Sequence, residues 1–121
     1  MLSLRCLLLS LGLLFTAAVK ADVITCSFTE PFITTSYDTS SKRMTLTYDV
    51  QKRRTALARV SMLETAPGVF EIRTANGQPV QRLKRTCRGS DGMSDRKYPY
   101  EAELIAEKLY GGCASTGTAR C

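Results

Sequence analysis

The segment richest in side chains that can do chemistry is residues 87–100, CRGSDGMSDRKYPY. It contains two aspartates, two serines, two tyrosines and Arg96, and this composition is too polar for a core strand. Gly89 and Gly92 permit the positive φ angles of a tight, irregular loop. Two interpretations of this loop follow from the residue types, and both stay open at this point.

The first interpretation is structural. Asp91, Ser94 and Asp95 bond to nearby backbone N–H groups, Arg96 pairs with Asp91 or Asp95, and Cys87 anchors the loop through a disulfide. The second is a recognition surface, in which Arg96 binds an anionic group, the carboxylates accept hydrogen bonds and the tyrosines anchor a sugar or a protein. The candidate binding residues are therefore Asp91, Ser94, Asp95, Arg96, Tyr98 and Tyr100.

Neither a metal site nor an enzyme active site is predicted. Asp91 and Asp95 match no calcium-loop spacing, and the chain contains no His, the commonest general base and metal ligand. No motif supports a Ser–Lys pair. Carboxylates for glycoside cleavage could come from Asp91, Asp95, Glu101 and Glu103, but a small β-domain leaves little room for a cleft. We expect no cofactor and no catalysis.

Two basic clusters stand out. Residues 52–54, Lys-Arg-Arg, are expected in a hairpin turn, where their charges are solvated. In the second cluster, Arg82, Lys84 and Arg88 share one face of a predicted strand. That face is either a solvated outer surface or a stripe that attracts an anionic glycan, a lipid headgroup or an acidic protein. We expect an envelope protein or an anionic glycan as partner and no nucleic acid, because aromatic residues are not interleaved with the basic ones.

Residues 1–21 are predicted to be a secretory signal peptide. Arg5 precedes an apolar run over residues 6–19, and small residues precede the expected cleavage site after Ala21. The run has about fourteen residues, fewer than the roughly 20 that cross a bilayer as a helix. The alternative is an uncleaved anchor. We expect a periplasmic or secreted protein with no stable membrane insertion after cleavage.

The mature region, residues 22–121, is expected to fold as a single exported domain. Loss of Arg5 and Lys20 leaves 15 of the 17 basic residues against 11 acidic ones, and loss of Cys6 leaves four of the five cysteines. An even number of cysteines in a short exported chain indicates two disulfides, which a small core needs for stability. Three connectivities are possible, and a zinc site is disfavoured by the lack of His and of a CxxC pair. The expected pairs are Cys87–Cys113 and Cys26–Cys121.

Strand periodicity runs through the whole mature region. In residues 43–50, for example, Met44 and Leu46 alternate with polar residues. Residues 101–109 contain helix formers, but the two-residue period over 98–106 favours a strand. Asn76-Gly77 predicts a hairpin turn. About seven or eight short strands predict an all-β fold, a small antiparallel β-barrel or sandwich stapled by disulfides. Strands are expected at residues 23–28, 32–37, 43–50, 56–63, 69–74, 79–86, 98–106 and 108–114.

Four short motifs carry a resemblance to a known family. They are Asp91-Gly92-Met93-Ser94-Asp95-Arg96, Tyr98-Pro99-Tyr100, Gly112-Cys113 and Glu30-Pro31-Phe32. This set resembles a family of small exported bacterial proteins that are described as uncharacterised or as predicted membrane proteins. The chain departs from the family pattern at Ile33 and Ala114, where the family has an aromatic residue and a second cysteine. The resemblance implies an envelope location and a small β-fold, and it implies no activity.

These observations together predict a non-catalytic, exported binding domain whose contact surface is the loop around Asp91 and Arg96. Two alternatives stay open. One is an inhibitor of a cell-wall hydrolase such as lysozyme, which is an analogy at the level of the fold. The other is a purely structural envelope protein.

Overall fold

The computed structural model describes residues 22–117 and residue 121, and the predicted signal peptide lies outside these residues. The described chain forms nine β-strands. The predicted all-β antiparallel fold is confirmed, with nine strands where about seven or eight are expected. The strands are β1 Val23–Phe28, β2 Ile33–Asp38, β3 Arg43–Tyr48, β4 Arg53–Leu57, β5 Ser61–Ala66, β6 Val69–Arg73, β7 Pro79–Gly89, β8 Tyr98–Leu104 and β9 Leu109–Ser115.

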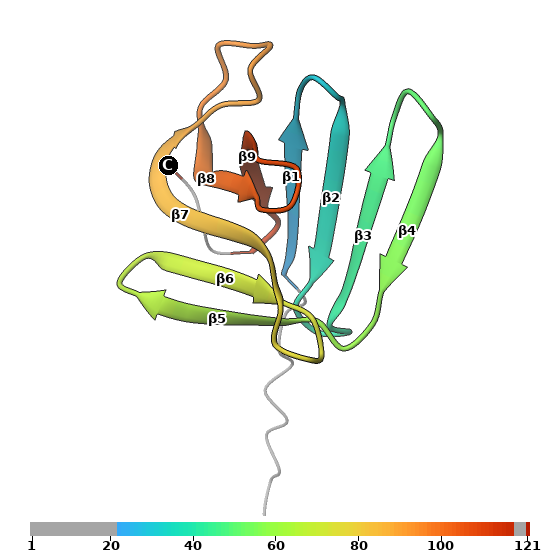
Figure 1. Ribbon diagram of the computed structural model, residues 1–121. Coiled ribbons are helices and arrows are strands. Elements are labelled where there is room, and N and C mark those ends of the chain that lie inside the picture. The colour runs from blue at the N-terminus through green and yellow to red at the C-terminus, as the bar shows by residue number, and fades with distance from the viewer. Residues whose placement is uncertain (1–21, 118–120) are drawn as a thin grey trace, which may run out of the picture.

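All nine strands belong to one sheet in the order β4-β3-β2-β1-β9-β8-β7-β6-β5. The sheet curls into a half-barrel, in which β1 to β4 stand side by side and β5 and β6 run crosswise to them at the lower left of the view (Figure 1). Within the described chain, only the β1–β9 pair joins strands that are not consecutive in the sequence. This pair holds the β1–β4 half against the β5–β9 half.

The connection between β4 and β5 is a bend of three residues. These strands are the two edges of the sheet, and they pair with β3 and β6 rather than with each other, so the bend does not close a hairpin. The prediction of one strand over residues 56–63 is therefore wrong. Arg59 has a φ of 56°, and Val60 turns into the core. The Val60 backbone donates to the Lys42 carbonyl at 2.9 Å and accepts from the Tyr37 hydroxyl at 2.8 Å.

The basic residues 52–54 only partly follow the prediction of a solvated turn. Lys52 lies in the β3–β4 turn, whereas Arg53 and Arg54 begin the edge strand β4. The Arg53 guanidinium lies 4.5 Å from the ring centroid of Tyr48. Charged side chains on an exposed edge strand hinder pairing with other chains, so these arginines protect the sheet edge.

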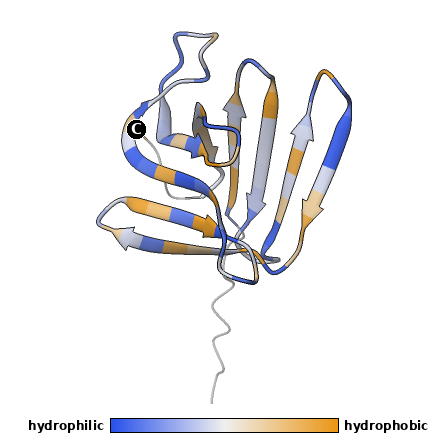
Figure 2. Ribbon diagram, in the orientation of Figure 1, coloured by the Kyte–Doolittle hydropathy of each residue, from blue (hydrophilic) through white to orange (hydrophobic). Residues whose placement is uncertain are grey.

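The core fills the concave side of the sheet with alternate residues of several strands, most regularly those of β1, β2 and β8. Along β7, hydrophilic and hydrophobic segments follow one another (Figure 2). Gln81 and Leu83 point into the core, while Arg82 and Lys84 are exposed. The sheet thus keeps one apolar face and one polar face, as expected for an antiparallel sheet with one side in water.

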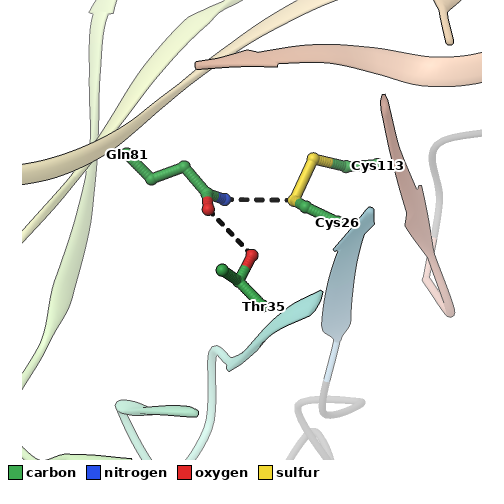
Figure 3. Close-up of a disulfide and its surroundings, with 4 residues drawn as sticks. All are labelled: Cys26, Thr35, Gln81 and Cys113. Atoms are coloured by element: carbon green, nitrogen blue, oxygen red, sulfur yellow. Dashed lines mark hydrogen bonds between the residues drawn. A yellow bond between two sulfur atoms is a disulfide. The ribbon is translucent and has the colours of Figure 1, made fainter. Parts of the chain in front are cut away.

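A polar contact crosses this core between the two halves. The Thr35 hydroxyl on β2 donates to the Gln81 side-chain carbonyl on β7 at 2.8 Å, and the Gln81 amide donates to the Cys26 sulfur at 3.0 Å (Figure 3). Among the described residues, every buried side-chain nitrogen and oxygen atom has a hydrogen-bond partner. A buried amide whose oxygen and nitrogen each form a hydrogen bond avoids much of the cost of an unsatisfied polar group.

The two predicted disulfides form, but the predicted pairing is wrong. Cys26 pairs with Cys113, and Cys87 pairs with Cys121. Cys26 and Cys113 face each other in the β1–β9 register with a Cα–Cα distance of 4.0 Å, and both are fully buried. The pairing depends on β1 and β9 being neighbours, which loop lengths alone do not reveal. Disulfides of this kind form and persist in oxidising environments outside the cytoplasm.

Replacement of both residues of the Cys26–Cys113 pair by Ala should destabilise the domain more than replacement of both residues of Cys87–Cys121. The sequence separations are 87 and 34 residues. Chain-entropy arguments then give about 4.6 and about 3.8 kcal/mol, and a buried cavity adds to the first value. Urea unfolding at low temperature, followed by circular dichroism, measures the difference.

Non-reducing proteolysis with mass spectrometry provides the control on connectivity. A disulfide-linked peptide pair containing Cys26 and Cys113 is expected. Peptides that link Cys26 to Cys121 would contradict the β1–β9 junction.

Candidate functional site

The loop between β7 and β8 is organised by one carboxylate. The Oδ1 atom of Asp91 accepts hydrogen bonds from the backbone N–H groups of Met93 at 2.9 Å and Ser94 at 2.8 Å. Its Oδ2 atom accepts from the hydroxyls of Ser94 at 2.8 Å and Tyr98 at 2.9 Å. The Asp91 side chain can therefore replace the regular backbone pairing that the loop lacks, as Asp does in many turns.

The hydrogen bonds and burial of this cluster also set the charge states of Asp91 and Tyr98. The Ser94 backbone N–H, the Met93 N–H and the Ser94 hydroxyl hold the pKa of Asp91 far below its usual range. Burial, and then the hydrogen bond to Asp91, raise the pKa of Tyr98. Asp91 is thus a carboxylate that accepts from a neutral phenol at neutral pH, and its lone pairs are already committed.

The structure brings four of the six predicted binding residues together in the loop, leaves Asp95 exposed outside this group and places Tyr100 in the core. Tyr98 and Tyr100 are only 9% and 7% exposed, so the interpretation of these tyrosines as exposed anchors is wrong. The reason is the strand period: alternate residues of β8 are buried, and Tyr100 contacts Phe70 edge to face with ring centroids 6.1 Å apart. Asp91 is likewise buried, whereas Ser94, Asp95 and Arg96 are exposed.

Arg96 does not form the predicted ion pair with Asp91 or Asp95. Its guanidinium carbon lies 4.8 Å from the ring centroid of Tyr98, and it forms no ion pair with any described residue. The Arg96 guanidinium lies over the face of the Tyr98 ring, and the Tyr98 hydroxyl donates a hydrogen bond to Asp91. Asp91, Ser94, Arg96 and Tyr98 therefore form one cluster whose visible role is to fix the loop.

An open groove of about 480 Å³ lies beside this loop on the polar face of β7, β8 and β9. A volume of this size is typical of small-ligand sites. The strand register places Arg82, Glu103 and Tyr110 in one row across the three strands, and Lys84, Glu101 and Gly112 in the next. The lining side chains are Arg82, Lys84 and Arg88 from β7, Glu101 and Glu103 from β8, Tyr110 from β9, and Ser90 from the loop.

Two consecutive glycines of β9 let the β7–β8 loop and β1 pack against this strand. A Cβ atom on Gly112 would lie 2.8 Å from the Tyr98 ring and 2.9 Å from the Ser90 nitrogen. A Cβ atom on Gly111 would lie 2.1 Å from the Ser27 carbonyl oxygen on β1. Only residues without side chains allow the loop and β1 to approach β9 this closely.

Some charged side chains of the groove form ion pairs, and others form none with a described residue. The Arg82 guanidinium bridges Glu103 at 3.3 Å and Glu71 at 3.6 Å. Glu71 also binds Arg73 at 2.7 Å, and this contact is the main reason that the pKa of Glu71 is lowered. Within residues 22–117 and 121, no ion pair involves Lys84, Arg88 or Glu101. Two cations and one carboxylate of the groove are thus available to a ligand.

The predicted shared face of Arg82, Lys84 and Arg88 coincides with the groove, since all three line it. The sequence interpretation missed Tyr110 as a site residue. The signal that could have found it is the Tyr110-Gly111-Gly112 run, in which an aromatic residue precedes two positions without side chains. Among the described residues, no group of three His, Cys, Asp or Glu side chains is placed to hold a metal ion.

The chain matches no protein-family model, no curated protein and no solved structure. In the part of the chain that the structure covers, no helix has the length and apolar character needed to cross a bilayer.

Asp91→Asn should lower the melting temperature at pH 7 by several degrees, because an amide donor then replaces the Oδ2 atom that accepts two hydroxyl hydrogen bonds. The pKa of Asp91 is lowered by folding, so its ionised form stabilises the domain above the ordinary Asp pKa of about 3.9. That contribution is lost as the pH falls towards the folded value. The gap between wild type and variant should therefore be constant near neutral pH and narrow below about pH 4.

Asp95→Asn is the matched control, since Asp95 is exposed and its side chain bonds to none of the described residues. Thermal scans of both variants across pH test the role of Asp91. Equal melting temperatures for the two variants at pH 7 would show that Asp91 does not organise the loop.

Proposed function

We propose that this protein is a non-catalytic binding domain of the bacterial envelope, periplasmic or secreted, that holds an anionic ligand in the groove of β7, β8 and β9. The observation that carries this proposal is the pair Lys84 and Arg88, which line an open groove without a carboxylate partner among the described residues. Long cationic side chains on a concave surface attract and orient anionic groups.

The disulfides and the leader support the proposed location. Cys26–Cys113 and Cys87–Cys121 are of a kind that persists outside the cytoplasm. Residues 1–21 have the pattern of a secretory signal peptide, and the DGMSDR and YPY motifs resemble those of small exported bacterial proteins.

The residues of the groove support binding rather than catalysis. The chain has no His. Of the two carboxylates in the groove, Glu103 is held in an ion pair by the Arg82 guanidinium, which donates to one of its oxygens at 3.3 Å. Glu101 is exposed on an open surface, where water competes for every contact. Asp91, a third candidate carboxylate, has four hydrogen-bond donors and faces Tyr98.

The double variant Lys84→Gln/Arg88→Gln should weaken anion binding by about tenfold, since two exposed charge contacts contribute up to about 1 kcal/mol each. The probes are two short chains with three carboxylates each: trigalacturonate, and a triglutamate peptide with blocked termini. Amide chemical shifts of the ¹⁵N-labelled mature domain, recorded at low ionic strength, report both the affinity and the residues involved.

Lys52→Gln/Arg54→Gln is the matched control, because it removes the same charge from an exposed hairpin outside the groove. This control should bind within about twofold of wild type, as expected for screened charges at a distance. The proposal fails if neither probe shifts the groove amides, or if both double variants lose affinity equally.

A further inference from the structure

We infer that the ligand of the groove is an oligosaccharide that carries carboxylate groups, with Tyr110 as the platform for one sugar ring. This assignment rests on the proposed function and names its ligand class. It is carried by three observations in one place: an exposed aromatic ring, a floor without side chains, and both signs of charge along the walls.

Tyr110 is unlike the other tyrosines of the described chain. Its side chain is 74% exposed, whereas Tyr37, Tyr98 and Tyr100 are buried. Tyr37 and Tyr98 donate their hydroxyl hydrogen bonds inside the protein, and Tyr48 donates to Glu107. The ring of Tyr110 packs into no core and its hydroxyl bonds to none of the described residues, so the whole side chain is free to contact a ligand in the groove that it lines.

The space beside Tyr110 suits a flat ring. Gly111 lines the groove in one register row with Ala102 and Leu83, whose side chains are buried, so the floor beside the tyrosine is backbone. The C–H groups on the face of a sugar ring carry small positive partial charges, which are attracted to the negative face of an aromatic ring. A Tyr ring also provides a large contact area at a small cost in conformational entropy.

The carboxylates of the groove favour a sugar over an acidic peptide. Glu101 and Glu103 only accept hydrogen bonds when ionised, and the hydroxyl groups of a sugar are donors. An acidic peptide would place its own carboxylates close to both glutamates, and like charges repel. A carboxylated sugar chain can present an anion to Lys84 and Arg88 while its hydroxyls bond to Glu101.

The dimensions indicate an oligosaccharide rather than a single sugar. Tyr110 lies on β9 and Lys84 on β7, and both strands are neighbours of β8. Two strand spacings amount to roughly 10 Å, which is longer than one sugar ring. A chain of two or three rings is needed to contact the tyrosine and the cations together.

Tyr110→Ala should weaken trigalacturonate binding about fivefold and leave triglutamate binding unchanged, because only the sugar uses the aromatic ring. Tyr110→Phe keeps the ring and should bind trigalacturonate within about twofold of wild type. Phe32→Ala removes an exposed aromatic side chain outside the groove and should have no effect. In wild type, nuclear Overhauser contacts are expected between the Tyr110 ring and sugar protons. At a concentration at which trigalacturonate saturates the site, monomeric galacturonate should not saturate it.

The outcomes separate this inference from the proposed function. If triglutamate binds as tightly as trigalacturonate, or if Tyr110→Ala has no effect on the sugar, the ligand class is wrong while the anion-binding groove stands. If neutral maltotriose binds as tightly as trigalacturonate, the requirement for carboxylates is wrong. If neither anionic probe binds, both proposals fail.

Discussion

The pairing of β1 with β9 is the contact on which the rest of the described structure depends. All other strand pairings join consecutive strands, so each half of the sheet could form locally, and this is the one strand pairing of the described chain that joins the halves. The Cys26–Cys113 disulfide lies at its centre, and the Gln81 amide reaches the same sulfur from β7 (Figure 3). A long-range contact that closes most of the chain is entropically costly, and a covalent bond across it removes much of that cost from folding.

The groove exists because of this junction. Strand β9 pairs with β1 on one side and β8 on the other, and the absence of side chains at Gly111 and Gly112 allows β1 and the β7–β8 loop to approach closely. The loop is held at that position by Asp91, whose four hydrogen bonds make it a wall of fixed shape. The DGMSDR segment is thus best understood as the support of a site, while the side chains that can contact a ligand project from the strands beside it. Loops that are fixed by a scaffold in this way are common in binding sites.

Much of the fold and part of the site follow from strand periodicity. The two-residue period of β7 and β8 predicts the all-β fold and the shared face of Arg82, Lys84 and Arg88, because neighbouring side chains of a strand point to opposite sides. Periodicity contains no information about which strands become neighbours, so the disulfide pairing was wrong. Periodicity also contains no information about the bend at Val60, because this bend depends on hydrogen bonds with Lys42 and Tyr37, which are distant in the sequence. The Tyr110-Gly111-Gly112 run is visible in the sequence, but the exposure of Tyr110 depends on how the neighbouring strands and the loop pack around β9, which is not a local property.

Amide hydrogen exchange of the oxidised mature domain tests the β1–β9 junction most directly. If this pair holds the halves together, its amides can open only when the whole domain unfolds, and they should exchange among the slowest in the protein. The edge strand β4 should exchange much faster, since it pairs on one side only. Exchange of the β1 and β9 amides as fast as those of β4, with β6 and β7 still protected, would show that the halves fold independently and would contradict the account.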